Sequence, residues 1–353
     1  MSLDKLRACV LGATGMVGQH FIRILENHPT FEVVAVTASE RSVGKKYSAA
    51  TDWIVSNMIP KNVEDEKVLA TNSDEILKQD VDLVFSALPS STAFDIESNL
   101  AQGGLPVFSN AGAHRMDADV PILIPEINPH HLELVKEQDY GDGFIVTNSN
   151  CSTSGLVFGL KPLQEFGIKF VTVSTYQAVS GAGRRGVSSM DILGNVIPFI
   201  SNEEEKMASE TKEILGSLES GRVKPATFDV NASCVRVPVQ DGHLESIVVD
   251  LEESVEVDHI IEIMNNFTGE PQSLHLPTAP SQPIVVLNES DRPQPKRDLS
   301  LDKGDLGMTV KIGRLRKQGG RLNMFLLVHN IMRGAAGASV LNAEFALAKG
   351  VFV

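Results

Sequence analysis

The sequence predicts an α/β protein of two domains, with a doubly wound N-terminal domain and an α+β domain built on a mixed sheet. Three observations predict this architecture. A strand–turn–helix–strand pattern occupies the first 40 residues, compact apolar runs typical of buried parallel strands continue to residue 147, and longer, partly alternating strands follow residue 170. The length of 353 residues also suits two domains better than one core.

The N-terminal pattern consists of strands over 7–11 and 31–37, joined by a helix over 16–27. The turn between the first strand and the helix reads Gly12-Ala-Thr-Gly-Met-Val-Gly18. Such a Rossmann-like βαβ unit exposes backbone N–H groups at a helix N-terminus, where a pyrophosphate can be held. Its three glycines are spaced more loosely than the standard G-x-G-x-x-G fingerprint. A turn that only lets the helix pack closely on the strand remains the alternative.

The residues after the second strand indicate which dinucleotide binds. An NAD site usually carries Asp or Glu there, which accepts from the ribose 2′-hydroxyl, whereas an NADP site has small polar and basic residues. Ser39, Arg41 and Ser42 can hold a 2′-phosphate, provided that the carboxylate of Glu40 points away. The sequence therefore favours NADP (NADPH), and a solvated Arg41 with no ligand is the alternative.

The later elements are predicted from their apolar runs and periodicities. Parallel strands are expected at 82–88, 106–109 and 144–147, followed by a helix from about 153 to 166. After these we expect strands at 171–176, 234–239, 244–251, 308–312 and 321–328, and helices at 204–215, 257–266 and 330–349. The Pro-rich segment from Pro277 to Pro295 is expected to be a loop.

These elements suggest how the chain is divided. We expect a first domain at residues 1–150, completed by a C-terminal helix within 330–353, and a second domain at 151–329. In open parallel sheets, ligands bind outside the carboxyl ends of the strands. We therefore expect the functional site at those ends, in the cleft between the two domains.

Composition and charge exclude several classes of function. The chain has 31 Lys and Arg against 45 Asp and Glu, a net charge of −14, so nucleic acids and anionic membrane surfaces are not expected partners. No apolar run approaches the ~18 residues of a membrane-spanning helix, and the N-terminus lacks the apolar block of a secretory signal. Three scattered cysteines form neither a disulfide framework nor a metal pattern. We therefore expect a cytoplasmic protein with reduced thiols and no metal.

Cys151 is the candidate nucleophile, because it lies between a buried strand and a helix. A helix N-terminus stabilises negative charge, so a thiol there should have a lowered pKa; a packed structural cysteine is the alternative. Cys9 and Cys234 lie inside strands and are expected to be small buried hydrophobes. A nucleophilic cysteine needs a proton acceptor, and His243, after a strand and an Asp-Gly turn, is the candidate. Arg236, seven residues earlier, suits a substrate carboxylate.

Six blocks of sequence, spread in order over almost the whole chain, carry a family resemblance. They are Gly12-Ala-Thr-Gly-Met-Val-Gly18, Ser109-Asn-Ala-Gly-Ala-His-Arg115, Asn148-Ser-Asn-Cys-Ser-Thr-Ser154, Gln177-Ala-Val-Ser-Gly-Ala-Gly183, Val235-Arg-Val-Pro-Val-Gln-Asp-Gly-His243, and His329-Asn330 with Arg333-Gly-Ala-Ala-Gly337. Together they resemble the aspartate-semialdehyde dehydrogenases, in particular the branch found in archaea and fungi. One block alone would be a weak signal, whereas six in order make a specific match.

The resemblance implies a role for each matching residue. Cys151 is implied as the nucleophile and His243 as the general base. The implied substrate-binding residues grip the carboxylate and amino groups (Arg236 and Glu203), hold the phosphate (Lys206, Arg115 and Asn150) or orient the substrate (Gln177). The selection of Glu203 over its neighbours Glu204 and Glu205 rests on the E-x-x-K spacing alone. A solvated acidic start of a helix, favoured by the helix dipole, is the alternative for this run.

The implied cofactor contacts combine the glycine turn with residues far from it in the sequence. They are Gly12, Thr14, Gly15, Met16, Val17, Gly18, Ser39, Arg41, Ser42, Ser180, Gly181 and Asn330. No metal is implied. The family forms dimers and tetramers through its second domain, so the resemblance also implies a homodimer or homotetramer.

The reaction implied by the resemblance is the NADPH-dependent reductive dephosphorylation of L-4-aspartyl phosphate to L-aspartate 4-semialdehyde, in the biosynthesis of threonine, methionine and isoleucine. The acyl phosphate would acylate Cys151, inorganic phosphate would leave, and hydride would reduce the thioester. The oxidative direction runs in reverse, with His243 accepting a proton. The expected partners are therefore this small-molecule substrate and inorganic phosphate.

Other functions fit parts of the same sequence. Malonyl-CoA reductases and N-acetyl-glutamyl-phosphate reductases share the architecture and the thioester, but a CoA donor would not require the phosphate residues. A nucleotide-binding protein with an inactive centre would have no physical reason to keep Cys151, Gln177, Arg236 and His243 together. A thiol hydrolase would explain the cysteine and the histidine but leave the glycine turn without a role.

Overall fold

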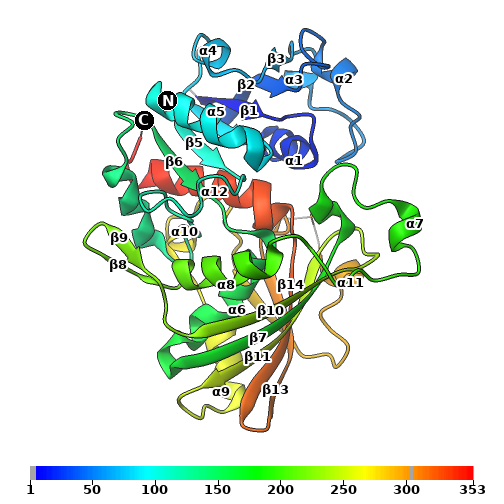
Figure 1. The fold of residues 1–353 in the computed structure, drawn as a ribbon, viewed down its shortest axis with the longest axis vertical. Helices are drawn as coiled ribbons and strands as arrows, with labels where there is room; N and C mark the ends of the chain where they lie inside the picture. The colour runs from blue at the N-terminus through cyan, green and yellow to red at the C-terminus, as the bar shows by residue number, and fades with distance from the viewer. Residues whose placement is uncertain (1–4, 300, 302–304, 353) are drawn as a thin grey trace.

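The computed structural model describes residues 5–299, 301 and 305–352, and consists of two six-stranded sheets with helices packed on them (Figure 1). The first part of the chain, from blue through cyan to the green strand β6 (Phe144–Thr147) in Figure 1, forms one sheet, and the later part, green to orange, forms the other. The predicted α/β fold class, with a parallel and a mixed sheet, is confirmed. Within the described ranges, no helix combines the length and the apolar character that crossing a membrane requires.

The first sheet is parallel throughout, in the order β3-β2-β1-β4-β5-β6. The chain builds outward from β1 in one direction and then from β4 in the other, which makes the sheet doubly wound. Its strands are β1 (Leu6–Leu11), β2 (Phe31–Ala38), β3 (Leu69–Ala70), β4 (Leu83–Ser86), β5 (Pro106–Ser109) and β6 (Phe144–Thr147). The last three are buried along their whole length, as expected of parallel strands covered on both faces.

Helices cover both faces of this sheet. The apolar sides of α1 (Met16–Leu25) and α12 (Gly337–Ala348) pack in one hydrophobic cluster, and α5 (Ser90–Gln102) packs in the cluster on the opposite face. The red helix α12 comes from the far end of the chain and lies against the first sheet (Figure 1). The amide Nδ2 of its Asn342 donates to Oδ1 of Asn148 over 3.0 Å, directly after β6. The C-terminus is thereby tied to the edge at which the parallel strands end.

Close packing explains the glycines of the first turn. Gly12 has a positive φ of 68°, and a Cβ on Gly18 would lie 2.3 Å from the carbonyl oxygen of Gly12. The absence of a side chain therefore lets α1 begin against the end of β1. This packing role does not exclude a ligand, because Gly15 at the N-cap has no side chain that could cap the helix.

The second sheet is mixed, in the order β10-β7-β11-β14-β13-β12. The outer pairs β10–β7 and β12–β13 are parallel, and the inner pairs are antiparallel. Its strands are β7 (Ile168–Gln177), β10 (Asp229–Arg236), β11 (His243–Leu251), β12 (Ile284–Leu287), β13 (Val310–Gln318) and β14 (Arg321–Val328). One face packs under α6 (Cys151–Leu160), α8 (Glu203–Ile214) and α9 (Val257–Asn265), and the large core of this half lies between them.

Shorter elements connect these layers. The short helices are α2 (Tyr47–Ala50), α3 (Lys61–Glu64), α4 (Ser73–Ile76), α7 (Ser189–Ile192), α10 (Glu270–Ser273) and α11 (Pro295–Asp298). The remaining turns are η1 (Pro129–Glu137), η2 (Lys161–Phe166), η3 (Val179–Ala182) and η4 (Met332–Ala336), and β8 (Ser217–Glu219) with β9 (Arg222–Lys224) forms a hairpin.

The structure corrects the predicted bounds of two elements near the site. The helix expected from 153 begins at Cys151, because Asn150 caps it, and it gives way at Leu160 to the 3₁₀ turn η2. Proline at position 162 lacks the backbone N–H that a continuing helix needs. The strand expected at 234–239 is β10, which begins five residues earlier, at Asp229, because it follows the parallel register of β7.

Two predictions in the last third of the chain were wrong in part. The expected loop from Pro277 to Pro295 contains β12, the edge strand next to β13, because its short run Ile-Val-Val-Leu is flanked by turn residues that hide the signal. The helix expected over 330–349 starts with the π-helical turn η4 and becomes α-helical only at Gly337. A wider turn at η4 lets the chain pass the N-terminus of α6, which it contacts.

Candidate active site

A pocket of about 340 Å³ lies where the carboxyl ends of the parallel strands meet the end of the second sheet. The loops after β4, β5 and β6 line one side of it, and the ends of β7 and β10 line the other. Twelve of the residues expected from the sequence line this pocket: Met16, Val17, Arg115, Asn150, Cys151, Gln177, Ser180, Gly181, Glu203, Lys206, Arg236 and Asn330. The tertiary structure thus gathers residues from all six blocks of sequence. The candidate base His243 is not among the lining residues and lies behind Cys151.

Cys151 is the first residue of α6, directly after the N-cap. The side chain Oδ1 of Asn150 accepts from the backbone N–H groups of Ser152 (2.9 Å) and Thr153 (3.1 Å). These two bonds satisfy donors that a helix start otherwise leaves unpaired. They also fix the direction in which α6 starts, and the Cys151 side chain is left half-buried on the pocket wall.

His243 contacts the Cys151 thiol on the side that faces away from the pocket. It opens β11, is fully buried, and has its Nε2 3.2 Å from the Sγ of Cys151. The backbone N–H of Ala178 donates to the Nδ1 of His243 over 3.1 Å. Because Nδ1 is occupied as an acceptor, this hydrogen-bond pattern assigns the proton of the neutral ring to Nε2, facing the sulfur.

The electrostatics of this pair differ from the expectation for a thiol at a helix start. Burial raises the pKa of the Cys151 thiol to about 12, the charge of Glu203 acts in the same direction, and the positive charges of Arg236 and Arg115 oppose them. Burial, followed by the charge of Arg236, lowers the pKa of His243 to about 3. The lowered thiol pKa expected from the helix start is therefore wrong. Desolvation exceeds the helix-end effect, and thiol and imidazole are both neutral.

Arg236 and Gln177 occupy the paired ends of β10 and β7, where their register makes them neighbours. The Nη1 of Arg236 donates to the carbonyl oxygen of Ala178 over 2.7 Å, which fixes the guanidinium at the pocket wall. The Nε2 of Gln177 donates to Oε1 of Glu203 over 3.0 Å. A guanidinium and a carboxylate thus face the same pocket, and such a pair can hold a ligand with both an acidic and a basic group.

The acidic run at the start of α8 separates into three environments. Glu203 is 6% exposed and lines the pocket. Glu204 turns to the second sheet, where its Oε1 accepts from the backbone N–H of Cys234 over 2.9 Å. Glu205 is exposed. Of the three, Glu203 is the one whose carboxylate can reach a ligand.

Arg115 and Lys206 lie on the pocket wall with Asn150. The Nη2 of Arg115 donates to the carbonyl oxygen of Asn110 over 2.9 Å, and its Nη1 donates to a buried carboxylate, Oε1 of Glu210, over 3.1 Å. Sequence reasoning missed Glu210. Its spacing of seven residues, two helical turns after Glu203, was the signal that could have found it.

The expected cofactor residues fall into two groups. Ser180 and Asn330 line the pocket and are joined by a bond of 2.9 Å from Asn330 Nδ2 to Ser180 Oγ. The glycine turn lies at the start of α1, whose Met16 and Val17 also line the pocket. Gly181 lines the pocket as well. The remaining seven lie outside the pocket lining, in the turn, at the start of α1 and just past the end of β2: Gly12, Thr14, Gly15, Gly18, Ser39, Arg41 and Ser42.

These residues fit a dinucleotide with a 2′-phosphate. The start of α1 has no side-chain cap, so its backbone N–H groups are available to a pyrophosphate. The backbone N–H of Ala13 donates to the carbonyl oxygen of Thr37 over 2.9 Å, which brings the glycine turn beside the end of β2. Arg41 and Glu40 are both exposed just past that end, so the carboxylate of Glu40 does not occupy a buried position there.

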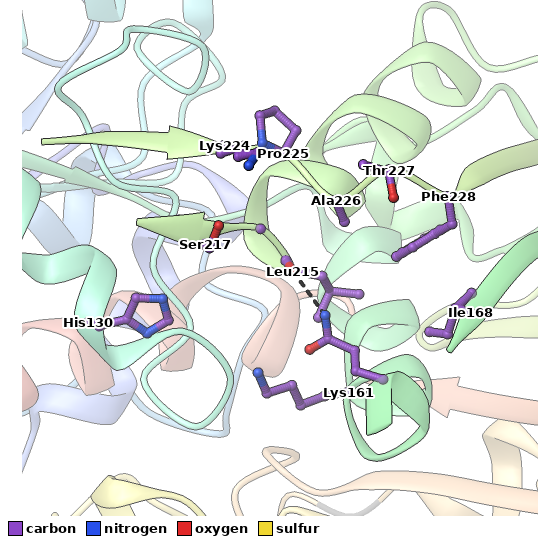
Figure 2. A pocket seen from close by; sticks show the side chains of 12 residues that line it. His130, Lys161, Ile168, Leu215, Ser217, Lys224, Pro225, Ala226, Thr227 and Phe228 are labelled. Atoms are coloured by element: carbon purple, nitrogen blue, oxygen red, sulfur yellow. Dashed lines mark hydrogen bonds between the residues drawn. The ribbon is translucent and has the colours of Figure 1, made fainter. Parts of the chain in front are cut away.

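A second hollow, of about 520 Å³, is larger but separate from these residues (Figure 2). It lies between η2 and the β8–β9 hairpin, with His130, Lys161 and Phe228 on its walls. The Nε2 of Gln164 donates to the carbonyl oxygen of Leu215 across one side of it, over 2.9 Å. None of the residues expected from the sequence lines this hollow, so size alone does not identify the functional pocket.

Two family models match the chain. The description "Semialdehyde dehydrogenase, NAD binding domain" matches residues 7–135, and "Semialdehyde dehydrogenase, dimerisation domain" matches residues 160–333. The aspartate-semialdehyde dehydrogenase of the archaeon Methanothermobacter thermautotrophicus is 49% identical over 342 residues, which cover 95% of this chain and 97% of the relative.

Two further relatives bear on the cofactor and the substrate. The crystal structure of aspartate semialdehyde dehydrogenase with NADP from Candida albicans has a TM-score of 0.89 and 40% identity, and covers 99% of this chain and 100% of that one. A malonyl CoA reductase (NADP) of Metallosphaera sedula is 38% identical over 353 residues, which cover 98% of both chains. The resemblance noted from the sequence is thus supported by archaeal and fungal relatives.

We expect the alkylation of Cys151 by iodoacetamide to be slow at pH 7 and to accelerate about tenfold with each pH unit between pH 6 and pH 9. Below a raised pKa, the thiolate fraction grows in proportion to the hydroxide concentration. The rate is measured by mass spectrometry of the peptide that contains Cys151. Glu203→Gln removes a charge that raises the thiol pKa and should accelerate alkylation at fixed pH. Glu205→Gln, exposed on the same helix, should not. A rate that levels off below pH 8 would contradict the raised pKa.

Proposed function

This chain belongs to the semialdehyde dehydrogenase family, and we propose that it catalyses the NADPH-dependent reductive dephosphorylation of L-4-aspartyl phosphate to L-aspartate 4-semialdehyde. This step serves the biosynthesis of threonine, methionine and isoleucine. The observation that carries the proposal is the 3.2 Å contact between Cys151 Sγ and His243 Nε2, beside a pocket with arginine, lysine and glutamate side chains. These groups match a substrate that has a reactive acyl group, two kinds of acidic group and an ammonium group.

Cys151 forms the covalent intermediate in this proposal. Its Sγ attacks the acyl carbon, the bond from that carbon to the phosphate oxygen breaks, and inorganic phosphate leaves with the bonding electron pair and takes up the proton that the thiol loses. The product is a thioester on Cys151, whose carbonyl is less resonance-stabilised than that of an oxygen ester. NADPH, when bound, supplies the hydride that reduces the acyl group. Expulsion of Sγ as a thiolate then releases the aldehyde, and a proton from solvent restores the thiol.

His243 acts as a hydrogen-bond donor and as a proton acceptor beside the reacting carbon in this proposal. In the reductive direction its Nε2–H donates a hydrogen bond toward the acyl oxygen as negative charge develops there. Its role as the general base in the oxidative direction requires the other tautomer, in which Nε2 carries no proton. The neutral Nε2–H form, kept by the Ala178 N–H bond to Nδ1, supports the first of these roles. General acid–base help of this kind contributes ~10²–10⁴-fold to rates.

Arg236 binds the substrate's α-carboxylate, Glu203 binds its amino group, and Gln177 orients it. An ammonium group beside Glu203 offsets the negative charge that raises the pKa of the Cys151 thiol, so such a substrate favours the thiolate. The malonyl group of malonyl-CoA has no amino group and would leave the Glu203 carboxylate without this partner. The site therefore favours an aspartyl substrate over a malonyl one.

Arg115, Lys206 and Asn150 bind the phosphate group in this proposal. The cofactor-binding residues are those of the turn after β1, the end of β2 and the η3–η4 side: Gly12, Thr14, Gly15, Met16, Val17, Gly18, Ser39, Arg41, Ser42, Ser180, Gly181 and Asn330. The supporting observations are the uncapped start of α1 and the pocket positions of Met16 and Val17. We assign residues 1–150 with 330–353 to the cofactor domain and 151–329 to the substrate domain.

We propose that two copies associate through the outer face of the second sheet. On this face Phe170, Val248 and Phe325 lie on neighbouring strands, at positions that alternate with the buried residues of the core. Phe170 is 40% exposed, and the matched dimerisation model covers the whole sheet. A homodimer, or a homotetramer built from two dimers, would cover this face. The cytoplasm is the proposed location, where the three free cysteines stay reduced.

The acyl donor is tested by mixing the protein with an acyl phosphate and no reductant. We expect one acyl adduct, located on Cys151 by mass spectrometry, because attack by Sγ does not require hydride. Cys151→Ser should give no adduct and no aldehyde, whereas Cys234→Ser, which replaces a buried cysteine outside the pocket lining, should still be acylated. An adduct from malonyl-CoA but none from acyl phosphate would reverse the assignment of the substrate.

The proton role is tested by His243→Ala. We expect turnover with NADPH to fall ~10²–10⁴-fold, since a buried proton-handling group is lost beside the reacting carbon. His243→Gln, whose amide N–H can replace the Nε2–H donor, should keep more of the reductive than of the oxidative rate. Equal rates for native and His243→Ala proteins in steady-state assays would mean that this histidine is only structural.

The association surface is tested by Val248→Lys. A charge at the centre of the outer face should lower the molar mass measured by light scattering toward that of one chain, because an unpaired buried charge is costly at an interface. Met58→Lys, at a position that is 77% exposed in the first part of the chain, is the matched control and should leave the mass unchanged. Association that survives Val248→Lys would place the interface elsewhere.

A further inference from the structure

Glu210 is a buried carboxylate beside the candidate site to which none of the roles above applies. It lies on α8, two helical turns after Glu203, so both side chains project from the same face of the helix. Only 2% of its surface is exposed. A charged carboxylate at such a position requires partners that compensate for the lost hydration.

The two oxygens of Glu210 have different partners. Oε1 accepts from Nη1 of Arg115 over 3.1 Å, and Oε2 accepts from the backbone N–H of Asn150 over 2.5 Å. Arg115 is 11% exposed at its side chain, and its ion pair with Glu210 is therefore shielded from water. Hydrogen bonds to ionised groups in such surroundings are stronger and more directional than those between neutral groups.

These contacts of Glu210, called here the Glu210 bridge, join two segments that make no other side-chain bond to α8 among the described residues. Arg115 belongs to the loop after β5, and Asn150 belongs to the loop after β6, where it caps α6 directly before Cys151. The Nε of Arg115 is buried and has no hydrogen-bond partner among the described residues. Glu210 and Asn110 thus fix the orientation of the guanidinium while leaving donors of Arg115 for an anion in the pocket.

We propose that Glu210 is a positioning residue that holds the phosphate-binding guanidinium of Arg115 and the peptide before Cys151 in one fixed geometry. Phosphate bound at Arg115 is then held at a set distance from the sulfur. This inference rests on the phosphate site of the proposed function. It goes beyond that function, because it assigns the affinity for phosphate in part to a residue on another helix that does not touch the phosphate.

The geometry requires a carboxylate. Glutamine offers one acceptor oxygen and one NH₂ group, so in Glu210→Gln a donor must face either Arg115 or the backbone N–H of Asn150. The charge that balances the guanidinium is also lost. The mutant keeps the shape of the side chain, which makes it a better test than Glu210→Ala, where a cavity would form.

The experiment measures how inorganic phosphate protects Cys151 from iodoacetamide in the full-length protein. We expect the half-protecting concentration of phosphate to rise about 10- to 100-fold in Glu210→Gln, the range for a lost hydrogen bond to a charged group. In the oxidation of aspartate semialdehyde, KM for phosphate should rise in the same proportion, while KM for NADP stays unchanged. A general loss of structure would raise both.

Two comparisons complete the test. Glu205→Gln makes the same change at an exposed position of α8 and should leave phosphate protection unchanged. In an Arg115→Ala background, Glu210→Gln should weaken phosphate protection far less than in the native background, because the two residues act through one interaction. Melting temperatures confirm that each variant is folded.

The outcomes separate this inference from the proposed function. Unchanged phosphate protection in Glu210→Gln would overturn the positioning role, and so would a native protein that phosphate does not protect. Independent, additive effects of Arg115→Ala and Glu210→Gln would also overturn it. A native protein that phosphate protects but that does not oxidise the aldehyde would refute the proposed function, while the protection assay would still decide the role of Glu210.

Discussion

The arrangement of the active site depends on one peptide segment, at Ala178, where β7 ends. Its N–H donates to the Nδ1 of His243, and its carbonyl oxygen accepts from the Nη1 of Arg236. The histidine opens β11 and the arginine ends β10, the two strands on either side of β7. One residue of backbone therefore fixes the imidazole at the sulfur and the guanidinium at the pocket wall. It also assigns the tautomer of the ring, since a nitrogen that accepts cannot carry the proton.

This buried contact determines the charges at rest. The start of a helix favours a thiolate, but the sulfur is enclosed by protein and lies near the carboxylate of Glu203, so its pKa rises. The imidazole is fully buried near Arg236, and its pKa falls. Thiol and imidazole are consequently both neutral. The nearby arginines and acids carry the charge of the site, and these are the groups that a charged substrate meets first.

Each of the two sheets supplies one side of the pocket. The parallel sheet presents its loops at one edge, as doubly wound sheets do, and the second sheet brings Gln177, Arg236 and His243 to that edge from the opposite direction. Buried polar contacts join segments that are distant in the sequence, both within the first half and between the two halves. Asn342 of α12 bonds to Asn148 after β6, and Glu210 of α8 bonds to Arg115 and to the backbone of Asn150. Such contacts fix the relative positions of the segments, because a buried polar group that loses its hydrogen-bond partner is costly, and only one arrangement satisfies all of these groups.

The sequence by itself determined the fold class, the strand–turn–helix start and the residue types of the site, because hydrophobic period, glycine spacing and helix-capping chemistry are local properties. The sequence also contains, in order, the six blocks that carry the family resemblance. Only the tertiary structure decided that His243 meets Cys151, that Glu203 rather than Glu205 faces the pocket, and that the thiol pKa is raised. It alone revealed β12 within the Pro-rich segment and the bridge of Glu210. Burial, register and contacts between distant segments set these features, and a one-dimensional pattern does not contain them.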